Sequence, residues 1–420
     1  SSWLKFFVVF VHAMGQSLRS GCDSCTSDAG TPKVEEVFTE VSGEKAQQLA
    51  LEEEDLTAEK EAQGPMKSFS HVQTPSTREA SSAAFTFSAS STVAAPSAGT
   101  PSSSLELDAQ AQVEEAGRLM REGDLFAAAE LLRKAIQSLE AAGNSAAIAA
   151  LRESEAFRVA TWRAADYMDL ASLLVLQQPG LSLVWEGGGS RLWVKTSSRQ
   201  DAGSKTAFEY QVATDIDASL SSCLAYANEL DLLPSCEPML VAAPETLGPA
   251  YPLLLITRSL IGILGFRIEL IFEVFRVCDE DFGFLTENIR SDFPEDGVPM
   301  PKRHWRYRRI NITTKNIWIP RGGGESGTTC MQVVNVELGF HIADFMLKKV
   351  LATVAKSVIT GLQTNSMKAA KPGSKWEERL ESDKSGFYTM CRKAEAAAAK
   401  RSAISANNLP TADIFKAPVF

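Results

Sequence analysis

The pattern of hydrophobic and polar positions divides the chain into helical and strand-like stretches. Between residues 105 and 178, hydrophobic side chains recur every three or four positions, as at Leu132, Ala135, Ile136 and Leu139, which predicts amphipathic helices. Gly123 and Asp124 interrupt the first two helical runs. We therefore expect an antiparallel helix pair followed by further helix, together a small helical bundle.

From about residue 180 the pattern changes to alternation with a period of two. The runs LSLVWE and RLWVKT flank a glycine-rich turn and predict a β-hairpin. Further strand-like runs follow, with one helix after Asp217. Residues 340–363 return to a helical period, which predicts one long amphipathic helix. We expect an α+β fold, in which a curved antiparallel sheet grips this long C-terminal helix.

Three stretches within residues 180–363 resemble a known family. They are TAFEYQVATDIDASLSSCLAYANELDLLPSCEP, FEVFRVCDEDFGFLTENIRSDFPEDGVP, and the run from RRINITTKNIWIP to the end of VITGLQ. Their order and pattern are similar to the START (steroidogenic-acute-regulatory-related lipid-transfer) domains, which have the helix-grip fold. The family often has Trp just after its first helix, where this chain has Ser235 and Cys236, and this departure leaves the ligand class open.

The resemblance implies non-catalytic binding or transfer of a lipid or sterol-type ligand in an internal cavity. The expected ligand-binding residues lie on the central strands and on the long helix: Phe272, Val274, Arg309, Ile317, Ile319, Val334, Val336, Met346, Val350 and Val354. A register slip of one residue would turn the side chains of any of these strands to the opposite face. Arg309 matches an Arg of the family and needs a buried partner if it points inward.

The rest of the chain divides by composition. Residues 1–104 are rich in Ser, Ala and acidic residues and are expected to be a disordered, low-complexity region. The apolar run 6–11 near the start leaves targeting open. Residues 105–178 resemble a single tetratricopeptide-like unit. Residues 364–420 are expected to be a basic, partly disordered tail that folds back on the domain, stays disordered or docks as a peptide.

The net charge and the positions of the basic residues indicate which kinds of partner the chain binds. The chain has 420 residues and a formal net charge of −10, so we expect no binding to nucleic acid, whose binders are normally basic. A basic stretch with interleaved aromatic residues stands out, and its expected membrane-contact residues are Lys302, Arg303, Arg306 and Arg308. Basic residues near a surface are attracted to anionic lipids by about 1 kcal/mol each. We expect peripheral contact with an anionic membrane, with a solvated basic face as the alternative.

Signatures of catalysis and of metal binding are missing from the sequence. The chain has no G-x-x-x-x-G-K-[ST], H-E-x-x-H or G-x-S-x-G motif, each of which carries a specific chemistry. Its 7 Cys and 4 His are scattered without ligand spacing, which favours a reducing, cytoplasmic location over a disulfide scaffold. We expect a protein that is not an enzyme and that carries no cofactor and no metal.

Two other functions stay open at this stage. Residues 105–178 could be a helical adaptor that binds a protein partner, with the START-like domain as a structural support. An enzyme of the related cyclase or hydratase type would need a polar, titratable cavity.

Overall fold

Helices come first along the described chain and a sheet follows them. The computed structural model describes residues 102–176, 180–196, 207–237, 240–263, 266–293, 298–302, 305–337 and 359–420. The N-terminal helices are α3 (Ser102–Glu122), α4 (Leu125–Ala141), α5 (Ser145–Glu153) and α6 (Glu155–Asp169), followed by the 3-10 helix η1 (Leu170–Leu174). Predictions for residues 1–101 lie outside the described residues.

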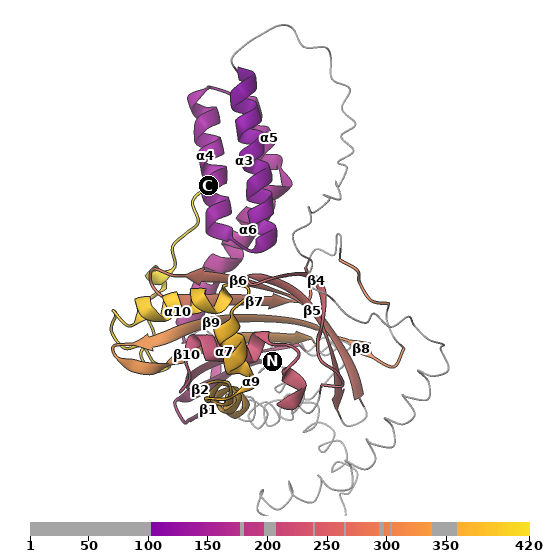
Figure 1. Cartoon of the computed structure of the whole chain (residues 1–420), viewed down its shortest axis with the longest axis vertical. Helices are drawn as coiled ribbons and strands as arrows, with labels where there is room; N and C mark the ends of the chain where they lie inside the picture. Colours follow the sequence, from indigo (N-terminus) through magenta and orange to yellow (C-terminus); the bar gives the residue numbers. More distant parts are fainter. Residues whose placement is uncertain are drawn as a thin grey trace, which may run out of the picture. The chain divides into compact units, whose positions relative to one another are not determined.

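Polar caps mark where these helices begin. Asp124, Asn144 and Ser154 immediately precede α4, α5 and α6, respectively. The side chain of each accepts a hydrogen bond from the backbone amide three residues further along the chain. Such caps satisfy amides that have no partner within the helix. The expected break at Gly123 and Asp124 is therefore the capped start of α4, and α3 and α4 lie side by side (Figure 1).

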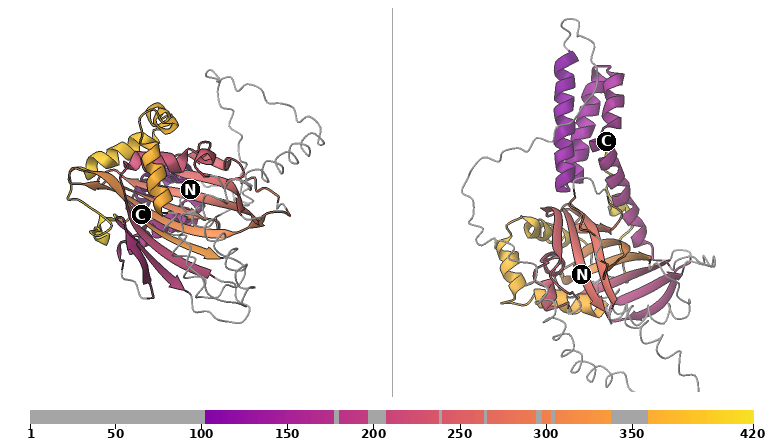
Figure 2. Two further views of the ribbon diagram at one scale, coloured as in Figure 1. Left: turned by 90° about the horizontal axis from the view of Figure 1, so that it is seen from below. Right: turned by 90° about the vertical axis from the view of Figure 1, so that its right-hand side faces the viewer.

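One antiparallel sheet makes up the second half, with its strands in the order β1-β2-β3-β10-β9-β7-β6-β5-β4. Figure 2 shows that the sheet is strongly curved. A short β8 pairs in parallel with β6. The strands are β1 (Ser182–Gly187), β2 (Ser190–Thr196), β3 (Ala207–Ile216), β4 (Glu245–Tyr251), β5 (Leu254–Ile263), β6 (Phe266–Asp279), β7 (Phe284–Arg290), β8 (Arg308–Arg309), β9 (Asn311–Gly322) and β10 (Glu325–Glu337).

The two faces of the sheet belong to two hydrophobic clusters. Phe272, Val274 and Trp318 belong to the inner cluster, with side chains from α7 (Leu220–Asn228), from residues 359–369 and from α10 (Phe387–Ala398). Phe275 and Ile317 belong to the outer cluster, with side chains from α3 to α6. Successive residues of a strand point to opposite faces, so the alternation seen in the sequence serves two cores.

A buried ion pair fastens the helical bundle to the outer face. The Arg163 guanidinium on α6 donates to the Glu273 carboxylate on β6 at 2.6 Å, and both side chains are nearly inaccessible to solvent. The Arg163 guanidinium also lies over the Phe275 ring, 4.2 Å from its centroid. Arg290 on β7 donates to Asp166 on α6 at 2.8 Å.

Residues 364–420 fold back on the domain, which is one of the alternatives left open by the sequence. They include α9 (Lys375–Ser382), α10 and the 3-10 helix η3 (Ala412–Ile414). A close approach positions α10, since a Cβ at Gly283 would lie 2.2 Å from the Ala394 carbonyl oxygen. The last residues join the outer cluster through Ile414 and Phe415.

The expected α+β fold class is confirmed by this sheet and its helices. The long C-terminal helix is described only over residues 359–369, and residues 340–358 lie outside the described part of the chain. The helix after β3 is capped by Ser219 and not by Asp217, because the Ser219 hydroxyl accepts from the Ser222 amide. Among the described residues, no helix has the length and hydropathy needed to cross a membrane.

Candidate ligand cavity

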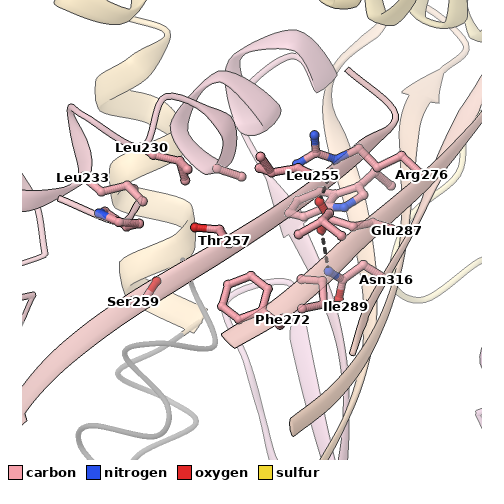
Figure 3. Close-up of a pocket in the computed structure, with 14 residues that line it drawn as sticks. Leu230, Leu233, Leu255, Thr257, Ser259, Phe272, Arg276, Glu287, Ile289 and Asn316 are labelled. Atoms are coloured by element: carbon pink, nitrogen blue, oxygen red, sulfur yellow. Dashed lines mark hydrogen bonds and ion pairs between the residues drawn. The ribbon is translucent and has the colours of Figure 1, made fainter. Parts of the chain in front are cut away.

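A cavity of about 40 Å³ lies on the inner face of the sheet. Side chains from β5, β6, β7 and β9 form one wall, and α7 and the chain after it form the other (Figure 3). Its lining residues are Ala227, Leu230, Leu233, Pro244, Leu255, Thr257, Ser259, Phe272, Val274, Arg276, Glu287, Ile289, Asn316 and Trp318.

Most of the lining is apolar because the inward positions of these strands are apolar. Phe272 and Val274 alternate along β6, and Leu255 on β5 pairs in register with Val274. Ile289 on β7 pairs with Val274 from the other side. Three neighbouring strands therefore contribute one continuous apolar surface to the cavity.

At the polar end of the cavity, the polar side chains form hydrogen bonds with one another. Arg276 Nε donates to Glu287 Oε1 at 2.9 Å, and Asn316 Nδ2 donates to Glu287 Oε2 at 2.8 Å (Figure 3). Arg276 also donates to Asn228 Oδ1 at 2.9 Å, and Gln332 Nε2 donates to Asn316 Oδ1 at 3.0 Å. The positive and negative charges at this end therefore cancel.

Neutral polar groups complete the inner face. Trp318 lines the cavity, and its indole Nε1 is buried without a hydrogen-bond partner among the described residues. Burial raises the pKa of the Tyr210 hydroxyl well above its usual value, and burial together with the nearby Glu237 does the same for Tyr226. A phenol is uncharged at neutral pH, so both side chains present hydroxyl groups to the inner face, and the Tyr226 hydroxyl donates to the buried Glu237 carboxylate.

Three of the expected ligand-binding residues lie on the inner face. Phe272 and Val274 line the cavity, and Val334 belongs to the inner cluster. Val336 lies in β10, but its side chain is outside the described part of the structure. Met346, Val350 and Val354 also lie outside the described residues.

Ile317 and Ile319 require a correction, because both belong to the outer cluster. In β9 the inward positions are those of Asn316 and Trp318, which line the cavity instead. The run KNIWIP has apolar residues at consecutive positions, so alternation alone left the register open by one residue. The outer face here is as apolar as the inner one since the helical bundle covers it.

Arg309 does not enter the cavity. Its Nε donates to Glu269 Oε2 at 2.8 Å, and Arg258 Nε donates to Oε1 of the same carboxylate at 2.8 Å. Glu269 lies between Ile268 and Leu270, whose side chains face the inner cluster, so the Glu269 side chain points to the outer face. Arg309 therefore has the buried partner that its charge needs.

Arg276, Glu287 and Asn316 line the cavity but are not among the residues expected from the sequence. A signal for Arg276 was present, since it continues the inward alternation of Phe272 and Val274 by one more step. An arginine at an inward position needs a carboxylate on a neighbouring strand. Glu287, two residues before Ile289 on β7, meets that need.

The basic stretch lies at the surface. Lys302, Arg306 and Arg308 are exposed, and Arg303 is outside the described residues. The Trp305 side chain is 84% exposed, and the Arg306 guanidinium lies 4.9 Å from its ring centroid. An indole and three cations thus share one exposed segment.

An open groove adjoins the cavity. This groove of about 350 Å³ shares Leu230, Pro244 and Leu255 with the cavity lining. These three side chains are thus common to the walls of the cavity and of the groove. No cluster of three or more His, Cys, Asp or Glu side chains suited to a metal ion occurs among the described residues.

The comparisons with known proteins give structural similarity alone. No family model matches the chain, and no curated protein matches it. Human STARD10 matches at a TM-score of 0.42 with 8% identity, over 59% of this chain and 94% of that one. Human StAR-related lipid transfer protein 5 matches at 0.38 with 14% identity, over 50% and 97%. A STAR-related lipid transfer protein from Xanthomonas axonopodis matches at 0.36 with 12% identity, over 45% and 99%.

Identities and TM-scores this low support no conclusion about ligand or activity. The tetratricopeptide-like resemblance of residues 105–178 is not confirmed by these comparisons. These three structures are START-related, the family that the sequence resembles, and the matches also include Ara h 8.0201 and the di-domain ARO/CYC protein BexL.

Proposed function

We propose that the sheet domain binds a lipid or sterol-type hydrophobic ligand without catalysis. The observation that carries this proposal is the cavity itself, which has an apolar wall from three strands and one charge-balanced polar end. Moving apolar surface out of water stabilises a complex by about 25 cal/mol per Å². The few polar groups at the end would orient the ligand.

The charge balance favours a ligand with an uncharged polar group. Glu287 neutralises Arg276, so a buried phosphate or carboxylate would bring a charge with no counter-ion among the described lining residues. Burying an unpaired charge is very costly. A hydroxyl or carbonyl, by contrast, could accept a hydrogen bond from the indole of Trp318, whose Nε1 has no partner among the described residues.

Ligand binding has to widen the cavity. Its volume is about 40 Å³, whereas pockets for small organic ligands measure roughly 300–1,000 Å³. The adjoining groove lies behind Leu230, Pro244 and Leu255, and displacement of these side chains would join the two spaces. Pockets of this kind are minor conformations that a ligand makes dominant.

Peripheral membrane contact fits the exposed basic segment. Trp305, Lys302, Arg306 and Arg308 are all exposed. Indole rings favour the level of lipid headgroups, and cations add attraction to anionic lipids. The free cysteines of the described residues support a reducing, cytoplasmic location.

Lipid uptake from vesicles tests the ligand class. The full chain is incubated with vesicles that contain a sterol, diacylglycerol or a fatty acid, re-isolated and extracted. We expect the sterol or diacylglycerol to be retained and the fatty acid to be left behind. Retention of the fatty acid alone would contradict the inference drawn from the charge balance.

The small cavity favours a second candidate function. In that case residues 105–178 are a helical adaptor for a protein partner, and the sheet domain is their structural base. The buried pair of Arg163 and Glu273, which holds the bundle against the sheet, would then serve to present the remaining faces of α3 to α6. A folded protein that takes up no lipid would favour this function.

A further inference from the structure

The end of the chain is attached in two different ways. Residues 401–406 are held by backbone hydrogen bonds: the Ile404 amide donates to the Arg321 carbonyl at 2.8 Å, and the Ala406 amide donates to Asp215 Oδ1 at 2.9 Å. The Gly323 amide donates to the Arg401 carbonyl at 2.9 Å. The glycine-rich loop between β9 and β10 therefore binds residues 401–406.

Residues 409–420, here called the strap, are held mainly by side chains. The amides of Ile414 and Phe415 donate to carbonyls within the strap itself. Lys416 forms an ion pair with Asp281 at 2.9 Å, but both side chains are largely exposed. An exposed pair of this kind contributes about 0–1 kcal/mol to stability.

The strap packs against aromatic rings of α6 and β7. The Phe415 ring lies 5.1 Å from the Tyr167 ring on α6 and 5.2 Å from the Phe284 ring on β7, measured between centroids. The Phe420 ring lies 5.6 Å from the Phe157 ring on α6. We call the surface formed by Phe157, Tyr167 and Phe284 the strap groove. It lies where the bundle meets the sheet, and the last residues of the chain run along the bundle (Figure 1).

We propose that the strap is a peptide ligand bound in cis, and that the strap groove accepts the same sequence in trans. Residues 407 and 408, between the two attached parts, are exposed, so the strap can leave while residues 401–406 stay in place. Ile414 and Phe415 are buried, and buried, well-packed side chains of this kind carry most of the energy of an interface. A tethered strap has an effective concentration on the order of millimolar, so it occupies the groove until its anchor is removed.

The full chain carrying both Ile414→Ala and Phe415→Ala tests this inference. The probe is a fluorescent synthetic peptide of residues 409–420, followed by anisotropy. We expect the double variant to bind the peptide at least ten-fold more tightly than the wild-type chain, whose groove is occupied. A peptide carrying Phe415→Ala should lose binding. The matched control is Val419→Ala, because Val419 lies in the strap but is 64% exposed, and this variant should behave as wild type.

Two results would overturn the proposal. The first is a folded double variant that does not bind the peptide, and the second is equal binding by variant and wild type. If the double variant fails to fold, hydrogen exchange of the wild-type chain decides the matter. The proposal requires amides of the strap to exchange at least ten-fold faster than those of Ile404 and Ala406, and equal protection would show that the strap is a fixed part of the core.

Discussion

Arg276 and Glu287 form an ion pair on neighbouring strands, with Nε and Oε1 2.9 Å apart and side chains that are 3% and 4% exposed. This pair is at the polar end of a mainly apolar cavity. Buried pairs seldom add stability compared with well-packed apolar residues. The pair is therefore weak evidence for stability, and under the proposed function its role would be to orient the ligand.

Single and double substitutions of Arg276 and Glu287 distinguish a role in ligand binding from a role in stability. We expect Arg276→Met or Glu287→Leu alone to lower the free energy of unfolding by about 3–5 kcal/mol, because each leaves one buried charge without its partner. The double variant should recover most of this loss or exceed wild-type stability by about 1–4 kcal/mol. Urea unfolding of all four proteins measures both effects.

Lipid uptake by the stable double variant then isolates recognition. We expect at least a ten-fold loss of uptake, since the polar end would lose its two charged side chains and the hydrogen bonds that they make. If the double variant took up lipid as well as wild type, the pair would have no part in binding.

Arg163 is one of the residues that attach the bundle to the sheet. We expect Arg163→Met to destabilise the protein by about 3–5 kcal/mol, because Glu273 then stays buried and unpaired. Lys315→Met is the matched control, since the carboxylate of its partner Asp169 is 58% exposed and such pairs contribute about 0–1 kcal/mol. Similar thermal melting shifts for the two variants would mean that Arg163 does not fasten the bundle.

Two glycines with similar backbone angles differ in their surroundings. Gly283 has φ +84° and Gly324 has φ +81°, but a Cβ at Gly283 would meet the Ala394 carbonyl oxygen at 2.2 Å, whereas one at Gly324 meets no atom within 4 Å. Gly324→Ala should lower the free energy of unfolding by about 1–2 kcal/mol, because alanine is strained in the left-handed backbone conformation. We expect Gly283→Ala to cost about 1–3 kcal/mol more, because α10 has to shift. Equal costs in chemical denaturation would contradict the packing of α10 on this turn.

Membrane contact is testable by charge reversal. We expect Arg306→Glu with Arg308→Glu to reduce co-sedimentation with anionic vesicles by at least five-fold at low salt, and high salt to weaken the wild type, because the Debye length falls from about 10 Å at 0.1 M to about 3 Å at 1 M. Lys371→Glu with Lys375→Glu makes the same change of net charge at two exposed sites elsewhere. If both pairs of substitutions acted alike, contact would depend on net charge and not on this segment.

The sequence predicted the fold more fully than the site. Alternation gave the strands of the sheet, and the break at Gly123 and Asp124 gave the turn between two helices. Alternation did not settle the register of β9, because both faces of the sheet are covered and Ile317 and Trp318 are equally buried. The usual rule that polar residues mark the exposed face fails in such a strand.

The polar end of the cavity depends on contacts that no local pattern contains. Asn228 on α7 meets Arg276 on β6 across 48 positions of sequence, and Asn316 on β9 meets Glu287 across 29. The attachment of the strap is similar, because Phe415 packs on Tyr167 and Phe284, which are far away in the sequence. Only the folded sheet brings these partners together.

Native mass spectrometry of the wild-type chain and of Ala227→Leu tests the central claim most directly. Ala227 lines the cavity from α7, so a larger side chain there should take up the space that a ligand needs. After incubation with sterol- or diacylglycerol-containing vesicles, we predict one bound lipid on wild type and on the control Ala111→Leu, whose site on α3 is exposed, and at least a five-fold lower bound fraction on Ala227→Leu. A folded wild-type chain that carries no lipid, or equal lipid on all three proteins, would contradict binding in this cavity.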